Sequence, residues 1–546
     1  MIDRNKNIFG KEWLAWEDPD VPEFFNPTNF LLDKHLATEK AKGVALVVDD
    51  ESFSYEEFLG QVCRASNGLQ ALRIETGSRL LLFGTDSLEF LAIWFGAIRS
   101  GIVPIVVSDA YKAISLLYFL QDTAAKSLFI DVEQTAKLKD VSEDIPWTLQ
   151  NVIVRGSTVE FAPESGDRNT LTYDEMVEGH SRTFLPIPLH YNDVAYMFYS
   201  GGTTGPAKGI THLAHDFSLV PERHGKFMEY GSNDIVHATS KKYFTHGIWP
   251  AVLIPFYFGA TSVISRLPPT ADNVIKIIES TKPNKLITVP TIIKNILLFA
   301  EQNRLPNFSS LNLVTSASEK MPPEVFERFE KMFGLEILDS IGSSEITYEW
   351  IANRPKEFRR GSLGKPVFGY DVKLMDDDGH EVNRPNINGE AWIGSRTTCF
   401  YYWRKLDKSR ETFVGEWART GDMLQFDEDG FFWFSGRSDD VFKVKGLWVS
   451  PIEVEAAITE HDAVLEAAVV SFTDDEGLIK PKAFIVLKPG KELIEDLVSE
   501  LKGNVRKIGG YKVPEEIEFV DSLPRTTLMK IDRRALRALE IRSRGE

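Results

Sequence analysis

Cysteine is nearly absent from this chain. Its 546 residues include only two cysteines, Cys63 and Cys399. Their positions show no metal-ligand spacing, and so low a cysteine content is typical of a reducing compartment. We therefore expect a cytoplasmic protein that does not use cysteine to bind a metal.

Basic residues are also too few to balance the acidic ones. There are 62 lysines and arginines against 80 aspartates and glutamates, which gives a formal net charge of −18. Such an excess argues against nonspecific binding to nucleic acid or to an anionic membrane. A local basic pocket for phosphate groups is still compatible with it.

The sequence lacks a signal core and an uninterrupted hydrophobic span. Residues 1–6 contain no apolar run, so we do not expect secretion. The longest apolar stretch, residues 247–264, includes Pro250, Pro255 and Gly259 and has no flanking belt of charge. This composition favours a buried core segment over a membrane span.

The length and the pattern of the chain predict a two-domain α/β protein. A chain of 546 residues is long enough for at least two hydrophobic cores. Short apolar runs alternate with helical patterns, which predicts mixed or parallel sheets covered by helices. The expected strands are 78–83, 102–107, 127–132, 285–289 and 312–316, and the expected helices are 88–99, 291–300 and 322–333.

The pattern changes in the last third of the chain. Between residues 361 and 435, glycine, aspartate and aromatic residues separate short strands, which predicts a small β-rich subdomain. After Gly436 a small α+β domain is expected. We place the boundary so that the domains comprise residues 1–437 and 438–546. The strands expected in this region are 371–375, 390–393, 431–435, 465–471 and 483–488, and the helices are 451–460 and 493–505.

A glycine-rich loop is the most informative motif. Residues 199–209 read Tyr-Ser-Gly-Gly-Thr-Thr-Gly-Pro-Ala-Lys-Gly and follow the apolar run 194–198. Such a loop can expose backbone N–H groups and wrap a polyphosphate. It differs from the common P-loop because Ala207 precedes Lys208 and Gly209 follows it. The loop predicts a bound nucleotide triphosphate; taken alone, it would also fit a glycine-rich surface loop.

Further motifs follow this loop in a fixed order. They are Ile-Gly-Ser-Ser-Glu at 341–345, Thr-Gly-Asp at 420–422, Gly-Arg-Ser-Asp-Asp at 436–440, Glu-Val-Glu at 453–455, and Pro-Arg-Thr at 524–526 followed by Lys530 and Arg533. Together with the loop they resemble the adenylate-forming enzymes, which include acyl-CoA ligases, luciferases and peptide-synthetase adenylation domains. Residues 25–30, 341–354 and 361–370 are most similar to benzoate-CoA and other aryl-CoA ligases.

This resemblance implies a fold and a reaction. The fold would be a large α/β domain with a β-rich subdomain, followed by a small mobile α+β lid. The reaction would be attack of a carboxylate on ATP to form an acyl adenylate, followed by transfer to coenzyme A. The implied acid is aromatic and benzoate-like, and the implied cofactors are ATP, Mg²⁺ and coenzyme A. No nucleic-acid or membrane partner is implied, and both a monomer and a homodimer remain possible.

Three other functions stay open at this point. The acyl group could pass to a carrier-protein phosphopantetheine or to another nucleophile. The acid could be aliphatic. The chain could also be a nucleotide-binding protein without catalysis, although the presence of all the charged motif residues argues against this.

The resemblance also assigns residues to the nucleotide, the lid and the thiol. The phosphates would be held by Ser200, Gly201, Gly202, Thr203, Thr204, Gly205 and Lys208; the adenine side would be formed by Ser316, Ala317, Ser318 and Glu319, with Ser344 nearby; and Asp422 and Arg437 would lie at the ribose. Glu345 would bind Mg²⁺. Lys530 would reach the reacting oxygens during adenylation. Asp439 would be the hinge, and Lys445 with Gly446 would border the pantetheine arm.

The acyl pocket is assigned by similarity to aryl-CoA ligases. Its expected residues are Phe244, Thr245, His246, Gly247, Gly342, Tyr348 and Glu349. His246 would lie near the substrate carboxylate. If Glu349 faces the pocket, it is a buried carboxylate and needs a partner. Our hypothesis is that it recognises an amino or hydroxyl group on the ring; the alternative is that it points into solvent.

Overall fold

The computed structural model divides the chain into two compact units. It describes residues 9, 11–157, 168–200, 207–319, 321–445, 447–474, 477–491, 496–525 and 531–543. For residues 541–543 it describes the backbone alone. The first unit contains the described residues up to Ser200, Ala207–Val372 and Ile393–Ala418. The second contains Lys373–Trp392 and the described residues from Arg419 onward. The boundary placed between residues 437 and 438 stays a prediction.

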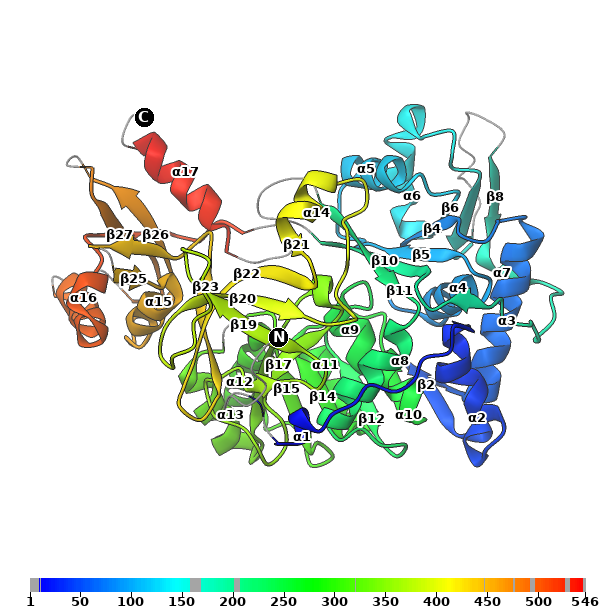
Figure 1. Cartoon of the computed structure of the whole chain (residues 1–546), viewed down its shortest axis with the longest axis horizontal. Helices are drawn as coiled ribbons and strands as arrows, with labels where there is room; N and C mark the ends of the chain where they lie inside the picture. Colours follow the sequence, from blue (N-terminus) through cyan, green and yellow to red (C-terminus); the bar gives the residue numbers. More distant parts are fainter. Residues whose placement is uncertain are drawn as a thin grey trace. The chain divides into compact units, whose positions relative to one another are not determined.

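A seven-stranded sheet forms one half of the first unit (Figure 1). In sheet order its strands are β11 (Lys208–Leu213), β10 (Val194–Ser200), β5 (Val103–Val106), β4 (Arg79–Phe83), β6 (Ser127–Asp131), β7 (Asn151–Arg155) and β8 (Asn169–Thr172). All neighbours pair in parallel except β10 and β11. The central strands are continuous apolar runs because helices cover both of their faces.

Within the described residues, five helices accompany this sheet, and one of them, α4, spans the predicted residues 88–99. They are α3 (Tyr55–Ala71), α4 (Leu88–Arg99), α5 (Ala113–Thr123), α6 (Thr135–Lys139) and α7 (Tyr173–Val177). On one face of the sheet, Phe119 of α5 packs with Leu81 and Phe83 of β4. On the other face, Phe90 of α4 contacts Phe129 of β6, with ring centroids 6.4 Å apart.

A nine-stranded sheet forms the other half of the first unit. Its order is β18 (Lys365–Pro366), β17 (Glu349–Ala352), β16 (Ile337–Gly342), β15 (Leu313–Ser316), β14 (Lys285–Thr288), β12 (Ile235–Ala238), β13 (Thr261–Ile264), β2 (Val44–Val48) and β3 (Glu51–Ser54). The six strands from β16 to β2 are parallel, and the outer strands are antiparallel. Helices α11 (Ala271–Thr281), α12 (Pro290–Gln302) and α13 (Pro323–Phe333) share one core with it. Ser316, the last residue of β15, pairs with Asp339 of β16, so both strands lead to the same edge of the sheet.

The long apolar stretch is buried inside the first unit. It comprises the end of α9 (Thr245–Ile248), the short π-helix η6 (Trp249–Leu253), α10 (Ile254–Phe258) and strand β13. Trp249 and Phe256 are fully buried within the protein. Across the described residues, none of the helices has both the length and the apolar character needed to cross a bilayer.

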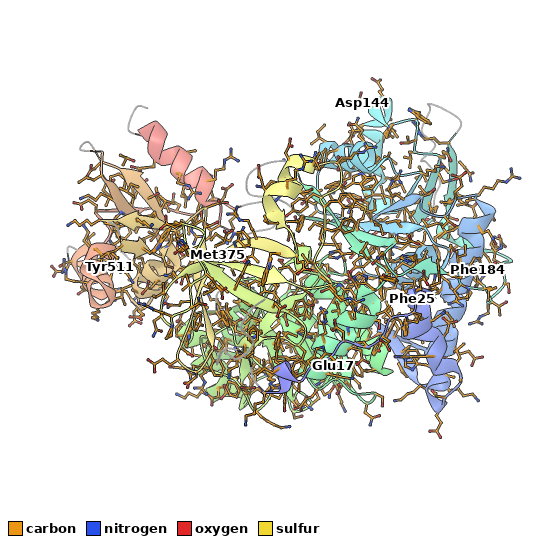
Figure 2. All side chains as sticks on the ribbon, viewed as in Figure 1. Glu17, Phe25, Asp144, Phe184, Met375 and Tyr511 are labelled. Atoms are coloured by element: carbon orange, nitrogen blue, oxygen red, sulfur yellow. The ribbon has the colours of Figure 1, made fainter. Side chains whose placement is uncertain are left out.

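The last third of the chain contains the expected β-rich segment and a small α+β core. The β-rich segment contains β19 (Asp371–Met375), β20 (Gly389–Gly394), β22 (Trp417–Phe426) and β23 (Phe432–Arg437). The α+β core contains β24 (Phe442–Val444), β25 (Leu447–Val449), α15 (Pro451–Thr459), β26 (Val464–Thr473), β27 (Ile479–Leu487), α16 (Leu497–Ile508), β28 (Glu516–Phe519) and α17 (Arg533–Ser543). Helices α15 and α16 cover one face of the β26–β27–β28 sheet, where Tyr511 packs (Figure 2). Leu536 of α17 packs against the other face.

The remaining elements are short and connect these sheets. They are α1 (Lys11–Leu14), β1 (Phe24–Phe25), α2 (Lys34–Leu36), β9 (Leu189–His190), α8 (Asp216–Val220), α14 (Leu406–Thr412) and β21 (Phe413–Val414). The mixed α/β architecture agrees with the fold class expected from the sequence.

Candidate active site

The two ends of the predicted phosphate loop are paired residues on neighbouring strands. Ser200 ends β10, Lys208 begins β11, and the two are partners in the antiparallel ladder. The intervening Gly201, Gly202, Thr203, Thr204 and Gly205 lie outside the described residues. The ladder therefore anchors both ends of this segment at the edge of the seven-stranded sheet.

Tyr402 connects the predicted phosphate lysine with the predicted metal ligand. The Lys208 Nζ atom lies 4.7 Å from the centre of the Tyr402 ring. The Tyr402 hydroxyl donates a 3.0 Å hydrogen bond to Oε1 of Glu345. Tyr402 is 2% exposed, so this arrangement is held inside the protein. Lys208 and Glu345 are 137 positions apart in the chain, and the structure brings them to opposite ends of one side chain.

The Glu345 site fits a magnesium ion. Carboxylate oxygens are the ligands that Mg²⁺ prefers, and a nearby ammonium group complements the remaining charge of a triphosphate. The hydrogen bond from Tyr402 orients the carboxylate in the way that partners of metal ligands usually do. Glu345 would therefore hold the ion, which would neutralise charge on the phosphates.

Replacing Tyr402 by phenylalanine tests this arrangement. The variant keeps the ring beneath Lys208 but loses the hydrogen bond to Glu345. We expect adenylation to slow by about 10-fold to 100-fold, the usual effect of removing a partner of a metal ligand, and more Mg²⁺ to be required. A Mg²⁺ titration of pyrophosphate exchange measures both, with Tyr401→Phe as the matched control. An unchanged Mg²⁺ requirement would contradict the assigned role.

Buried polar contacts hold the turn that carries Glu345. The Nε2 atom of His212 lies 2.7 Å from the backbone oxygen of Ser344, and its Nδ1 lies 3.0 Å from Asp216. Thr347 adopts φ 77° and ψ −54°, an unfavourable conformation for a β-branched residue. Its hydroxyl donates to the backbone oxygen of Thr397 at 2.6 Å. Contacts from several elements therefore fix this short turn.

Gly342 allows the same turn to close tightly. A Cβ atom at this position would lie 2.6 Å from the backbone oxygen of Tyr348 and 2.8 Å from the Cα atom of Glu349. Any side chain would thus push apart the backbone between Gly342 and Glu349, because backbone atoms cannot move aside as a flexible side chain can.

We therefore expect Gly342→Ala to impair both stability and catalysis. Overpacking of this kind lowers the free energy of unfolding by about 1–3 kcal/mol. A displacement of about 1 Å at Glu345 would slow adenylation by about 100-fold. Thermal unfolding and pyrophosphate exchange measure the two effects. Gly231→Ala is the matched control, since no atom lies within 4 Å of a Cβ added there. Wild-type exchange by the Gly342→Ala protein would show that the turn tolerates opening.

The predicted adenine-side residues follow the adjacent strand. Ser316 ends β15, and its backbone oxygen accepts a 3.2 Å hydrogen bond from Ser340 of β16. Ala317, Ser318 and Glu319 come next, with Ser318 at φ 75° and the Glu319 carboxylate accepting from Thr291 at 2.9 Å. Ser316 thus lies beside β16, the strand that leads to Glu345, and the contact of these residues with adenine stays a prediction.

The predicted acyl segment touches this turn through a hydroxyl contact. The Thr245 and Ser344 hydroxyl oxygens are 3.3 Å apart. The neighbouring Gly247 packs so closely that a Cβ atom there would lie 2.1 Å from the backbone oxygen of Lys241. Phe244, by contrast, is 37% exposed.

Glu349 is buried and fully engaged. It is 2% exposed, so the alternative in which it points into solvent is wrong. Ser340 donates to Oε1 at 2.7 Å, the Nε2 atom of His224 lies 2.6 Å from Oε2, and the Nε2 atom of His246 lies 3.8 Å from Oε1. Burial opposes ionisation of this carboxyl group, yet the hydrogen bond and charge of His224 hold its pKa below the usual value. Burial and the adjacent Glu349 raise the pKa of the Tyr348 phenol.

The predicted ribose residues form an ion pair in the second unit. Asp422 of β22 and Arg437 of β23 are partners in the ladder. Arg437 donates from Nη1 to Oδ1 of Asp422 at 2.8 Å and to the backbone oxygen of Thr420 at 2.7 Å. The carboxylate is thereby oriented at the end of the strand pair.

Two arginines tie helix α17 to the predicted hinge. Arg537 donates to the backbone oxygen of Asp439 at 3.2 Å and to the Asp440 carboxylate at 3.1 Å. Arg533 donates to the carboxylate of Glu455 at 2.7 Å. Lys445, with φ 53°, is described, whereas Gly446 and Lys530 lie outside the described residues.

The sequence reasoning missed the residues that join these motifs. Tyr402, His212 and His224 lie 57, 132 and 125 positions from their partners Glu345, Ser344 and Glu349. Long-range contacts of this kind carry no local pattern. The available signals were the dense aromatic run at 400–403 and the five histidines between His212 and His246.

Known proteins match nearly the whole length of the chain. The profile of the AMP-binding enzyme family matches residues 33–403, and that of the AMP-binding enzyme C-terminal domain matches residues 453–530. The benzoate–CoA ligase of Thauera aromatica is 34% identical, over 95% of this chain and 97% of the relative. The 4-hydroxybenzoate–CoA/benzoate–CoA ligase of Rhodopseudomonas palustris is also 34% identical, over 95% and 94%.

Solved structures of similar proteins superimpose over nearly the same extent. The anthranilate CoA ligase AuaEII, crystallised with anthranoyl-AMP, gives a TM-score of 0.89 at 33% identity and covers 96% of this chain and 99% of its own. A benzoate CoA ligase from Burkholderia xenovorans LB400 gives 0.82 at 31% identity, over 94% and 100%. The resemblance inferred from the motifs is confirmed.

Proposed function

The chain belongs to the AMP-binding enzyme family, and we propose that within it the chain is an AMP-forming ligase that joins an aromatic carboxylic acid to coenzyme A. In the first step a carboxylate oxygen attacks the α-phosphorus of ATP, and the bond to pyrophosphate breaks. In the second step the thiolate of coenzyme A attacks the acyl carbon, and AMP leaves. The acid must be activated because oxide is a very poor leaving group.

The observation that carries this proposal is the link from Lys208 through Tyr402 to Glu345. The first step brings an anionic acid toward an anionic triphosphate, so catalysis needs positive charge and fixed positions. Lys208 supplies an ammonium group next to the anchored ends of the glycine-rich segment. Glu345 would hold Mg²⁺ from the other side of Tyr402.

The second unit would supply the remaining groups. Asp422, oriented by Arg437, would accept the ribose hydroxyls. Lys530 would reach the reacting oxygens during adenylation. Rotation about Asp439 would then bring Lys445 and Gly446 beside the pantetheine arm. We also propose a cytoplasmic location, which the two free cysteines, Cys63 and Cys399, support.

An aromatic acid is the substrate class that the comparisons favour. The relatives named above act on benzoate, hydroxybenzoate or anthranilate according to their names. In this chain, His246 and Tyr348 would line the acyl site, where their ring centroids are 6.3 Å apart.

Carboxylate-dependent exchange of pyrophosphate into ATP tests the proposal. We expect exchange with benzoate or with its amino or hydroxy derivatives, and little with acetate or butyrate. Adding free coenzyme A should then yield an aryl-CoA thioester. Exchange without a thioester product would indicate a carrier protein or another nucleophile as acceptor, and exchange with aliphatic acids alone would reject the aromatic assignment.

A further inference from the structure

Each oxygen of the Glu349 carboxylate has a hydrogen-bond partner within the protein. Ser340 donates to one oxygen at 2.7 Å, and His224 lies 2.6 Å from the other. All three residues are at most 5% exposed. A carboxylate so engaged orients its neighbours, and it is a poor direct contact for a substrate group.

Of Glu349, Ser340 and His224, it is His224 that has a ring nitrogen not used in these contacts. Its Nε2 faces a carboxylate oxygen, so that nitrogen carries a hydrogen whether the ring is neutral or charged. Its Nδ1, on the other side of the ring, is buried and has no hydrogen-bond partner among the described residues. Buried polar atoms are nearly always paired, so an exception needs an explanation.

The surroundings of His224 suggest which group could bind its Nδ1 atom. Its ring meets the Tyr348 ring edge to face, with centroids 4.5 Å apart. Its partner Glu349 also lies 3.8 Å from His246, the residue expected near the substrate carboxylate. His224 therefore lies beside two of the residues that would line the acyl site.

On the basis of the proposed function, we propose that Nδ1 of His224 binds an amino or hydroxyl substituent on the ring of the acid. In the neutral ring, Nδ1 accepts a hydrogen bond from either group. In the charged ring, Nδ1–H donates to a hydroxyl oxygen. Unsubstituted benzoate offers Nδ1 no partner, so a substituted acid gains a hydrogen bond that benzoate lacks.

The substrate is thus an amino- or hydroxybenzoate, and its recognition residue is His224, positioned by Glu349. The proposal assigns to His224 the ring contact that the sequence analysis expected of Glu349. We expect kcat/KM for the preferred isomer to exceed that for benzoate by about 10-fold to 100-fold.

The experiment compares benzoate with the three aminobenzoates and the three hydroxybenzoates, in the wild type and in Glu349→Gln. In the variant, the amide oxygen can accept from Ser340, which turns the amide N–H toward Nε2 of His224. That nitrogen must then accept, and Nδ1 becomes a donor. We expect the preference for the preferred amino derivative over benzoate to fall by about 10-fold. General damage to the site would lower kcat/KM equally for both substrates and leave their ratio unchanged.

A matched control removes a different paired carboxylate. Glu357→Gln breaks the contacts with Arg354 and Lys365 and should leave the ratio unchanged. The inference is overturned if the wild type turns over benzoate as efficiently as every derivative. It is also overturned if folded Glu349→Gln keeps the wild-type preference for the amino derivative over benzoate. Should Glu349→Gln not fold, the wild-type panel decides alone. Absence of exchange with all seven acids would instead reject the proposed function.

Discussion

Replacing Lys530 by alanine is expected to abolish most adenylation while sparing thioester formation. In the first step the ammonium group would neutralise charge on the carboxylate and on the oxygen that bridges to pyrophosphate. Loss of such a group typically slows a reaction by about 100-fold to 1000-fold. In the second step the lid would have rotated and withdrawn the lysine, so its loss should matter little.

Two assays separate these steps. Pyrophosphate exchange with the preferred acid reports adenylation, and release of AMP from a supplied acyl adenylate with coenzyme A reports thioester formation. Lys507→Ala, an exposed lysine in the last turn of α16, is the control for removing a positive charge from the same unit. Equal loss of both half-reactions in Lys530→Ala would show that the lysine does not act in adenylation alone.

The fold was largely predictable because its elements have strong local patterns. Helix α4 spans the predicted residues 88–99; Ser87 accepts a hydrogen bond from the backbone of Phe90 at its start, and Gly101 follows its end at φ 69°. Each parallel strand is a short apolar run with polar residues or glycine beside it. Of the helix expected at 493–505, residues 493–495 lie outside the described residues, and the described helix ends at Ile508 instead of residue 505. It is a polar segment with only three buried residues.

The chemistry of the site was predictable from motifs, but its supporting contacts were not. Lys208, Glu345 and Asp422 each lie in a short motif whose resemblance to the adenylate-forming enzymes implies phosphate, metal or ribose binding. The buried environment of Glu349 depends on Ser340 and His224, which come from a neighbouring strand and a distant helix. A sequence pattern reports periodicity and local turn chemistry, and it carries no record of which distant side chains meet.

Replacing Glu345 by glutamine should have the second largest effect, a loss of at least about 100-fold in adenylation. A neutral amide is a weaker ligand than a carboxylate for Mg²⁺, and the loss should exceed the effect of removing its partner Tyr402. The amide oxygen can still accept from the Tyr402 hydroxyl, so the turn itself should persist. Exchange measured over a Mg²⁺ titration should therefore show a higher metal requirement at an unchanged melting temperature.

The comparison among three variants distinguishes a metal ligand from a structural carboxylate. Glu336→Gln removes a carboxylate paired with Arg360 and should leave exchange and its Mg²⁺ requirement unchanged. Tyr402→Phe should shift the Mg²⁺ requirement in the same direction as Glu345→Gln, but by less, because it disturbs only the orientation of the ligand. If Glu345→Gln lowered exchange without altering the Mg²⁺ requirement, Glu345 would hold the turn and another group would hold the ion.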